Sequence, residues 1–392
     1  MKDFIFHTPT KVVFGREAED KLGGLLRAQG CRKVLLHFGG QSAERSGLLG
    51  RVRAILNAEG IDWVELGGVV PNPRLSLVYE GIELGRSEGV DFILAVGGGS
   101  VIDSAKAIGY GLGGGGDVWD FFDRKRKVTA CTPIGVVLTI AATGSEMSAS
   151  CVITAEDGWV KRGCTSELCR PVFAVMPPQL TQTLPDYHTA SGCVDILMHT
   201  MERWFYGSGG MDVTEGIAAS LMRTTMKHAL ILRDDPQNYE SRAEVLWAGA
   251  LSHNGLTGCG TDGGDWGPHK IEHELSGLFD VVHGAGLAAV FGSWARYVAS
   301  RKPERFVRFA QRVMNVSGAG TDQEMALKGI EAFEDFCRSI HMPTNLRELG
   351  VEPTEAQMRE MAEKCITSMG GPVGKIVPLT ADDIFEIYKM AL

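Results

Sequence analysis

The sequence predicts two domains of different class, an α/β domain followed by an all-helical one. Its 392 residues exceed what one hydrophobic core usually serves, so two cores are expected. Between residue 33 and about residue 180, short apolar runs alternate with amphipathic stretches. After Pro185 the apolar residues recur at helical spacing, and runs rich in β-branched residues become scarce. The chain therefore changes fold class near its middle.

The first half has the pattern of alternating strands and helices. Buried strands are expected at Val34–Leu36, Trp63–Val64 and Phe92–Val96, and helices at Leu48–Leu56 and Leu75–Ser87. Turn residues separate these segments. Such alternation is typical of βαβ units around a buried parallel sheet. We therefore predict a Rossmann-like α/β domain for this half.

The second half is predicted to be mostly helical. Pro177, Pro178 and Pro185 cluster where the pattern changes, and prolines interrupt regular elements. We place the boundary there, which gives domains of residues 1–182 and 183–392. The segments with helical periodicity are Val194–Trp204, Ile217–Leu232, Ala243–Leu251, Phe306–Val313 and Met325–Ile340.

Charge and composition narrow the possible partners. The net charge is −9 and the basic run Arg124–Lys127 is short, which argues against nucleic acid or an anionic membrane surface. The opening MKDFIFHTPTKVVFG lacks the regions of a secretory signal, and no stretch has the roughly 18 apolar residues of a spanning helix. The nine cysteines form no Cys-x-x-Cys pair, so reduced thiols without a role are expected. We expect a cytoplasmic protein that acts on a small molecule.

A glycine-rich loop, Gly97–Ser100, joins the predicted strand Phe92–Val96 to a helical stretch. Glycines let a bulky anion approach the backbone, and the N–H groups at the start of the next helix favour phosphate. The loop therefore predicts a pyrophosphate site, although glycine-rich turns of this kind also occur without a ligand. Ser100 and Asp103 have a second interpretation as a capping box, in which they only satisfy N–H groups of the helix.

A second loop, Gly39 and Gly40 followed by Ser42, comes after the early strand Val34–Phe38. In dinucleotide sites an acidic residue at such a place holds the ribose hydroxyls and repels a 2′-phosphate. No acidic residue occurs here before Glu44, which favours NADP(H) over NAD(H). The alternative is a simple turn of small residues without a ligand.

Thr139, Thr143 and Ser148 lie in a segment of small and hydroxyl residues after the apolar run Ile134–Leu138. Such residues can line a nicotinamide or phosphate pocket with hydrogen-bond donors while leaving room for the ligand. Turns of small residues also occur without ligands, so this segment supports a cofactor site only together with the two glycine loops.

Five residues of the helical half suggest a metal site. Asp195 and His199 are four apart, as are His269 and His273, and this spacing places each pair on one face of a helix. His283 follows beside a glycine. Three imidazoles and one carboxylate suit Fe²⁺, Zn²⁺ or a similar divalent metal. Taken singly, each histidine is more often a hydrogen-bonded structural residue, and it is the combination that predicts a site.

With these residues assembled, the chain resembles the iron-containing (group III) alcohol dehydrogenase family, especially its branch of NADPH-dependent aldehyde reductases and butanol dehydrogenase-like enzymes. The similarity runs essentially from end to end. The motifs that carry it are Phe6–Gly15, Pro71–Pro73, Gly97–Asp103, Thr143–Glu146, Thr183–Pro185, Asp195-x-x-x-His199, His269-x-x-x-His273 and His283-Gly284.

The resemblance implies a role for each matching position. Asp195, His199, His269 and His283 would bind the metal, and His273 would lie beside the nicotinamide and substrate as a catalytic, proton-transferring residue. Together with the loops above, the predicted cofactor site comprises Gly39, Gly40, Ser42, Asn72, Gly97, Gly98, Gly99, Ser100, Asp103, Thr139, Thr143, Ser148 and Lys161. The family's fold is a Rossmann-like domain and a helical domain, as in dehydroquinate synthase, and its members are usually dimers or larger.

The activity expected from this resemblance is hydride transfer between NADP(H), or NAD(H), and a primary alcohol or aldehyde, with the metal polarising the substrate oxygen. A polyol dehydrogenase or a dehydroquinate synthase-like lyase on the same fold is the nearest alternative. Two alternatives of another class are a metal-dependent hydrolase and a nucleotide-binding protein without turnover.

Overall fold

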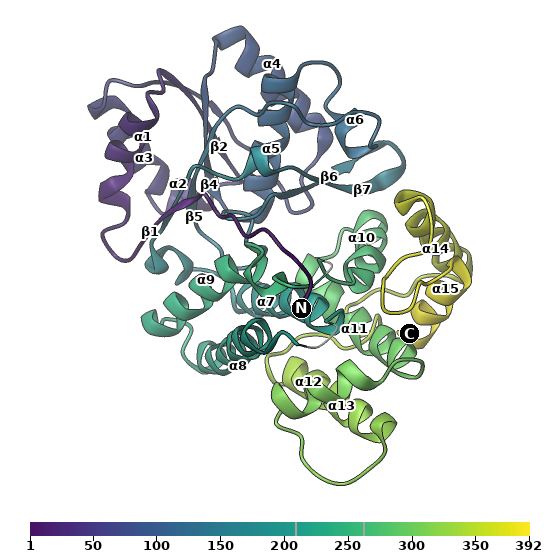
Figure 1. Ribbon diagram of the computed structural model, residues 1–392. Helices are drawn as coiled ribbons and strands as arrows, with labels where there is room; N and C mark the ends of the chain where they lie inside the picture. Colours follow the sequence, from purple (N-terminus) through teal and green to yellow (C-terminus); the bar gives the residue numbers. More distant parts are fainter. Residues whose placement is uncertain (208–209, 262) are drawn as a thin grey trace. The chain divides into compact units, whose positions relative to one another are not determined.

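The computed structural model describes residues 1–207, 210–261 and 263–392 and divides the chain into two compact units (Figure 1). One unit is Thr8–Thr183, and the other joins Met1–His7 to Leu184–Leu392. The first seven residues thus belong with the helical half, although we expected them in the α/β half. These residues contact the helical half directly, since the N–H of Lys2 donates to the carbonyl of Gly260.

The α/β unit is built on a six-stranded sheet in the order β1-β8-β5-β4-β2-β3, and all its pairings are parallel. A separate antiparallel hairpin pairs β6 with β7. The hairpin and the two strands β1 and β8 were not among the predicted strands. The bounds are β1 Lys11–Phe14, β2 Lys33–Phe38, β3 Asp62–Leu66, β4 Phe92–Gly97, β5 Ile134–Leu138, β6 Ser150–Ala155, β7 Val160–Thr165 and β8 Phe173–Met176.

Helices cover both faces of this sheet, which confirms the predicted α/β class (Figure 1). Val34 and Leu36 of β2 belong to one hydrophobic core with Leu25 of α1 and Leu49 of α3. His37, the residue after Leu36, contacts α5 on the other face of the sheet, because side chains alternate along a strand. The helices are α1 Leu22–Gln29, α2 Ser42–Arg45, α3 Leu48–Ala58, α4 Leu75–Glu88, α5 Gly99–Gly114 and α6 Trp119–Phe122.

His37 links three elements of the sheet domain and is completely buried. Its Nδ1 donates to the carbonyl of Leu66 in β3 over 2.8 Å, and its Nε2 therefore accepts from Ser104 Oγ of α5 over 2.9 Å. Burial lowers the pKa of His37 from its usual 6.5 to about 4, because the apolar surroundings disfavour the charged ring.

This shift predicts a loss of stability in mild acid. The unfolded chain takes up a proton at His37 near pH 6.5, and the folded chain does so only near pH 4, so stability falls as the pH drops through this window. At about 1.4 kcal/mol per pKa unit, the loss approaches about 3 kcal/mol. Chemical denaturation from pH 7 to pH 4 measures it, with His37→Asn as the control that should lack this component. Equal pH dependence of the two proteins would contradict the prediction.

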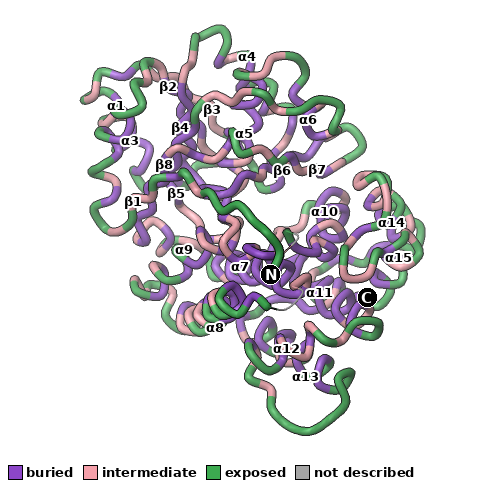
Figure 2. Tube along the Cα trace, in the orientation of Figure 1, coloured by how far each residue is buried: buried purple, intermediate pink, exposed green. Residues whose placement is uncertain are grey.

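The second unit is helical, as predicted from its periodicity. Its helices α7 and α11 are buried along most of their length (Figure 2). Among the described residues, no helix combines the length and the apolar character needed to cross a membrane. The helices are α7 Asp186–Phe205, α8 Asp212–Asp234, α9 Tyr239–His253, α10 Gly267–Phe279, α11 His283–Ala299, α12 Glu304–Arg312, α13 Asp322–Ser339, α14 Glu355–Met369 and α15 Ala381–Met390.

Candidate functional site

The predicted cofactor loops lie at one edge of the sheet. Gly39 and Gly40 follow β2, Gly97–Ser100 spans the end of β4 and the start of α5, and Thr139 follows β5. These three strands are parallel neighbours in the sheet, so their carboxyl ends meet along the same edge. In open α/β sheets this edge is where ligands bind.

Glycines form the start of α5. The residue before the helix, Gly98, is extended and has no side chain with which to cap the first N–H groups. A Cβ on Gly98 would lie 3.0 Å from Ile140, and one on Gly99 would collide with the Thr143 side chain. The glycines are therefore required by packing as well as by the expected approach of phosphate.

The capping-box interpretation of Ser100 and Asp103 is wrong. The helix begins at Gly99, which places Ser100 inside the first turn and beyond the capping position. The Asp103 carboxylate points elsewhere: it accepts from Ser145 Oγ over 2.6 Å and from the N–H of Val152 over 2.9 Å. Asp103 thus connects α5 to the segment that contains Thr143 and Ser148.

A lysine that the sequence did not single out strengthens this connection. Lys106 lies one turn after Asp103 on α5 and is completely buried. Its Nζ lies within 2.7–3.3 Å of five oxygens to which its three N–H groups can donate: the carbonyls of Ser145, Ser148 and Ser150 and the hydroxyls of Ser145 and Ser148. Ser148 is thereby held in place, and the segment after β5 is tied to the helix whose start forms the predicted phosphate site.

The structure also brings together Asn72 and Lys161, which are 89 residues apart. Lys161 Nζ on β7 donates to Asn72 Oδ1 over 2.9 Å, and both residues are buried. Asn72 has a φ of 54°, a left-handed conformation that asparagine tolerates better than most residues. The remaining predicted residue, Ser42, is exposed at the start of the short helix α2.

The four predicted metal-binding residues converge on one carboxylate oxygen. Asp195 and His199 lie one turn apart on α7, His269 on α10, and His283 begins α11. Asp195 Oδ1 is 3.2 Å from Nδ1 of His199, 3.7 Å from Nε2 of His269 and 3.8 Å from Nε2 of His283. Residues from three helices therefore gather around a single point.

The atoms at this point fit a metal ion. Asp195 Oδ1 and His269 Nε2 are buried and lack a hydrogen-bond partner within the described part of the chain. Buried polar atoms without partners are costly, and a cation between a carboxylate and imidazole nitrogens removes that cost. Oxygen and imidazole donors are also the set that Fe²⁺ and Zn²⁺ accept.

Electrostatics at the cluster favour positive charge. Burial opposes ionisation of Asp195, but the neighbouring imidazoles outweigh it and hold the pKa of this carboxyl well below its usual range. Burial lowers the pKa of His199 well below its usual value, which leaves a neutral ring. Burial also disfavours charge on His269, yet Glu202 and Asp195 raise its pKa to about 9.

His273 lies beside the cluster. It is buried on α10, and its ring centre is 6.5 Å from that of His269 and 5.8 Å from that of His283. The His283 side chain is 22% exposed and those of the other three cluster residues at most 7%, so access to the cluster is greatest next to His283 and its neighbour His273.

Two carboxylates that the sequence did not single out complete the cluster. Glu202 on α7 bonds to Nδ1 of His269, and Glu272 on α10 bonds to Nδ1 of His283. Each glutamate follows a histidine of its own helix at a spacing of three, so a repeated His-x-x-Glu pattern was the available signal. The pattern shows which face each glutamate occupies, but not that its partner lies on another helix.

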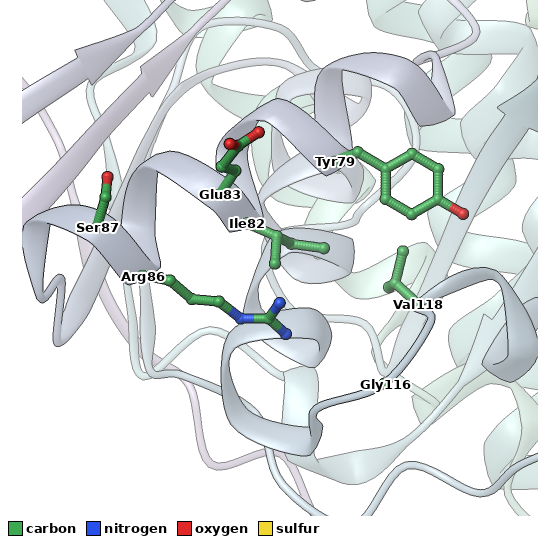
Figure 3. A pocket seen from close by; sticks show the side chains of 7 residues that line it. All are labelled: Tyr79, Ile82, Glu83, Arg86, Ser87, Gly116 and Val118. Atoms are coloured by element: carbon green, nitrogen blue, oxygen red, sulfur yellow. The ribbon is translucent and has the colours of Figure 1, made fainter.

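A separate hollow of about 490 Å³ opens on the α/β unit between α4 and the segment after α5 (Figure 3). Three of its polar side chains are already engaged: Tyr79 donates to Asp117, Arg86 to the carbonyl of Gly111, and Ser87 to the carbonyl of Leu84. None of the predicted site residues lines it. The lining residues are Tyr79, Ile82, Glu83, Arg86, Ser87, Gly116 and Val118.

Comparison with known proteins covers nearly the whole chain. The iron-containing alcohol dehydrogenase profile matches residues 9–178, and the C-terminal profile of the Fe-containing alcohol dehydrogenase family matches residues 189–392. NADH-dependent butanol dehydrogenase A of Clostridium acetobutylicum is 38% identical, with 99% of each chain covered. The NADPH-dependent aldehyde reductase YqhD of Escherichia coli is 32% identical, with 100% of each chain covered. The crystal structure of NADH-dependent butanol dehydrogenase A from Thermotoga maritima superposes with a TM-score of 0.95 at 40% identity, covering 100% of this chain and 99% of that one.

Proposed function

The chain belongs to the iron-containing alcohol dehydrogenase family, and we propose that it exchanges hydride between NADP(H) and a primary alcohol or its aldehyde at a metal held by Asp195, His199, His269 and His283. Membership makes it an oxidoreductase. The metal-binding residues, the preferred cofactor and the substrate class are the proposal. Iron(II) is the metal we propose, in keeping with the family.

The convergence on Asp195 Oδ1 is the observation that supports this proposal most. One buried carboxylate oxygen without a hydrogen-bond partner in the described chain faces ring nitrogens of histidines from three helices. A divalent metal bound there acts as a Lewis acid, which polarises a carbonyl oxygen or lowers the pKa of an alcohol. Asp195 supplies the negative charge. His199 Nδ1 donates to the backbone carbonyl of Asp195 over 2.9 Å, so the lone pair of the neutral ring is on Nε2.

We propose His273 as the residue that moves the proton. Aldehyde reduction requires one proton at the substrate oxygen for each hydride delivered to the carbon, and alcohol oxidation releases it. A ring nitrogen of His273 lies close to the cluster on the side of His283, where access is greatest. Imidazole is suited to this task because its pKa is close to neutral pH.

Replacement of His273 tests this role. In His273→Ala we expect a turnover about a hundredfold lower, the usual contribution of general acid–base catalysis, and loss of one limb of the pH–rate profile. His228→Ala, which removes a histidine of α8 bonded to Ser241 and outside the cluster, is the control and should keep the parental turnover. Unchanged turnover and an unchanged pH–rate profile in His273→Ala would remove this residue from the mechanism.

The preference for NADP(H) is supported by the loop after β2. Gly39 occupies the position at which a carboxylate would hold the ribose hydroxyls, and the first acid beyond it is Glu44. Both oxygens of Glu44 are bound by the Arg53 guanidinium over 2.7–2.9 Å, so Glu44 is engaged elsewhere. The relatives include enzymes named for either cofactor, so this loop is the basis of the proposal.

A direct assay tests the whole proposal. The purified protein is analysed for metal and then mixed with a panel of aldehydes, each with NADPH and with NADH, and with a panel of alcohols, each with NADP⁺ and with NAD⁺. We expect bound iron and a fall in NADPH absorbance when a medium-chain aldehyde such as hexanal is added. The proposed hydride transfer would be contradicted if the absorbance changed with none of the compounds. Release of phosphate from a phosphorylated sugar acid would favour a lyase instead.

A further inference from the structure

Glu202 and Glu272 are two carboxylates with no exposed surface, each bonded to one imidazole of the cluster. Glu202 Oε1 accepts from Nδ1 of His269, and Glu272 Oε2 accepts from Nδ1 of His283. In both rings the other nitrogen, Nε2, faces Asp195 Oδ1, at 3.7 and 3.8 Å. The same arrangement therefore occurs twice, on two pairs of elements.

This arrangement determines the protonation of both rings. A carboxylate can only accept a hydrogen bond, so in the neutral imidazole it holds the single proton at Nδ1 and leaves the lone pair of Nε2 directed at the cluster. It also restrains rotation of the ring and makes the nitrogen on the far side a stronger electron donor. Without the carboxylates, His269 and His283 would be free to adopt the other tautomer.

Stability of the fold does not explain the burial of Glu202. Glu202 Oε2 is buried without a hydrogen-bond partner within residues 1–207, 210–261 and 263–392, which is a cost to folding. Glu272 is better held, because its Oε1 accepts from Ser276 Oγ one turn further along α10. A buried carboxylate that is incompletely satisfied is retained where it serves a function.

Further buried charged groups surround Glu202. The Arg203 guanidinium and the Asp265 carboxylate both lie close to it. The Arg203 guanidinium donates to the carbonyls of His199 and Ser252, so it is fixed in position.

We propose, on the basis of the metal site proposed above, that Glu202 and Glu272 are positioning residues that orient His269 and His283 and raise the affinity for the divalent cation. Neither glutamate needs to touch the metal or the substrate. Their effect acts through the imidazoles, and it is therefore expected in metal binding itself and not only in turnover.

The test is the dissociation constant of Zn²⁺, measured by competition with a chromophoric chelator on metal-stripped protein. Glu202→Gln and Glu272→Gln keep the side-chain volume and an oxygen that can accept from Nδ1, but remove the charge. We expect each to weaken Zn²⁺ binding by about 10- to 100-fold. The visible absorption of bound Co²⁺ should change as well, because it reports on the donor set.

Glu334→Gln is the matched control. Glu334 is a buried carboxylate on α13 paired with Arg296, outside the cluster. Its replacement should lower the unfolding temperature and leave Zn²⁺ affinity and the Co²⁺ spectrum unchanged. A loss of Zn²⁺ affinity in Glu334→Gln as large as in the two cluster variants would overturn the assignment.

Ser276→Ala keeps the result interpretable if a glutamate variant does not fold. It leaves all four proposed ligands and both carboxylates in place and removes the bond that anchors Glu272, together with a weaker contact to the carbonyl of Val281. We expect a folded protein with measurably weaker Zn²⁺ binding, and parental affinity in it would rule out the role of Glu272.

Asp195→Asn separates this assignment from the metal site itself. If Asp195→Asn loses Zn²⁺ and the two glutamate variants bind it as tightly as the parent, the positioning role is wrong and the metal site stands. If Asp195→Asn also binds Zn²⁺ like the parent, the proposed metal site is wrong and the positioning role fails with it.

Discussion

Replacing Asp195 by asparagine is expected to lower the rate of aldehyde reduction by about a thousandfold while leaving NADPH binding unchanged. Asp195 Oδ1 is the atom that the three imidazoles share, and the substitution removes its charge without changing the volume of the side chain. Lewis-acid catalysis contributes several kcal/mol, and each 1.36 kcal/mol is tenfold in rate, so about 4 kcal/mol corresponds to this loss.

Steady-state kinetics measure the rate of aldehyde reduction, and a fluorescence titration measures the affinity for NADPH. The proposed cofactor residues belong to Thr8–Thr183, whereas Asp195 belongs to the helical unit, so cofactor affinity is expected to survive. Asp186→Asn makes the same chemical change at an exposed position on α7 and should leave turnover at the parental level. A fully active Asp195→Asn would be incompatible with the proposed metal site.

Replacing Gly39 by aspartate is expected to reverse the cofactor preference. A carboxylate there would repel the 2′-phosphate of NADP(H), which carries nearly two negative charges, and would accept from the ribose hydroxyls of NAD(H). We expect the ratio of kcat/KM with NADPH to that with NADH to fall by about a hundredfold, since repulsion between like charges costs a few kcal/mol.

The control for Gly39→Asp is Gly39→Asn, which has the same shape without the charge. A Cβ at Gly39 would lie 3.3 Å from the carbonyl oxygen of Val69, so any side chain requires a small adjustment. Both variants share that adjustment, and only the aspartate should shift the ratio strongly towards NADH. Equal use of both cofactors by the parent enzyme would contradict the interpretation of Gly39.

Much of the fold follows from local patterns. The strands Phe92–Gly97 and Ile134–Leu138 and the helices α4 and α7 were visible as apolar runs or helical periodicities, since strands and helices repeat every two and 3.6 residues. Strand β1, strand β8 and the hairpin of β6 and β7 were not predicted. These are short segments whose place in the structure depends on partners far away in the sequence, as in the pairing of Lys11 with Phe173.

The sequence by itself determined that Asp195 and His199, and likewise His269 and His273, share a helix face, because a spacing of four is nearly one turn. It also determined that a glycine loop separates a strand from a helix. Only the tertiary structure decided that His269 and His283 meet at one oxygen of Asp195, and that Glu202 serves a histidine of another helix.

The physical reason is the range of the interactions. Helical spacing is a property of the backbone and acts within a few residues, so it can be read along the chain. The Asp103 carboxylate bonds to Ser145 and Val152 and does not cap the helix. These partners depend on which elements pack against α5. Such packing is chosen by contacts between residues tens of positions apart, for which a single sequence carries no direct signal.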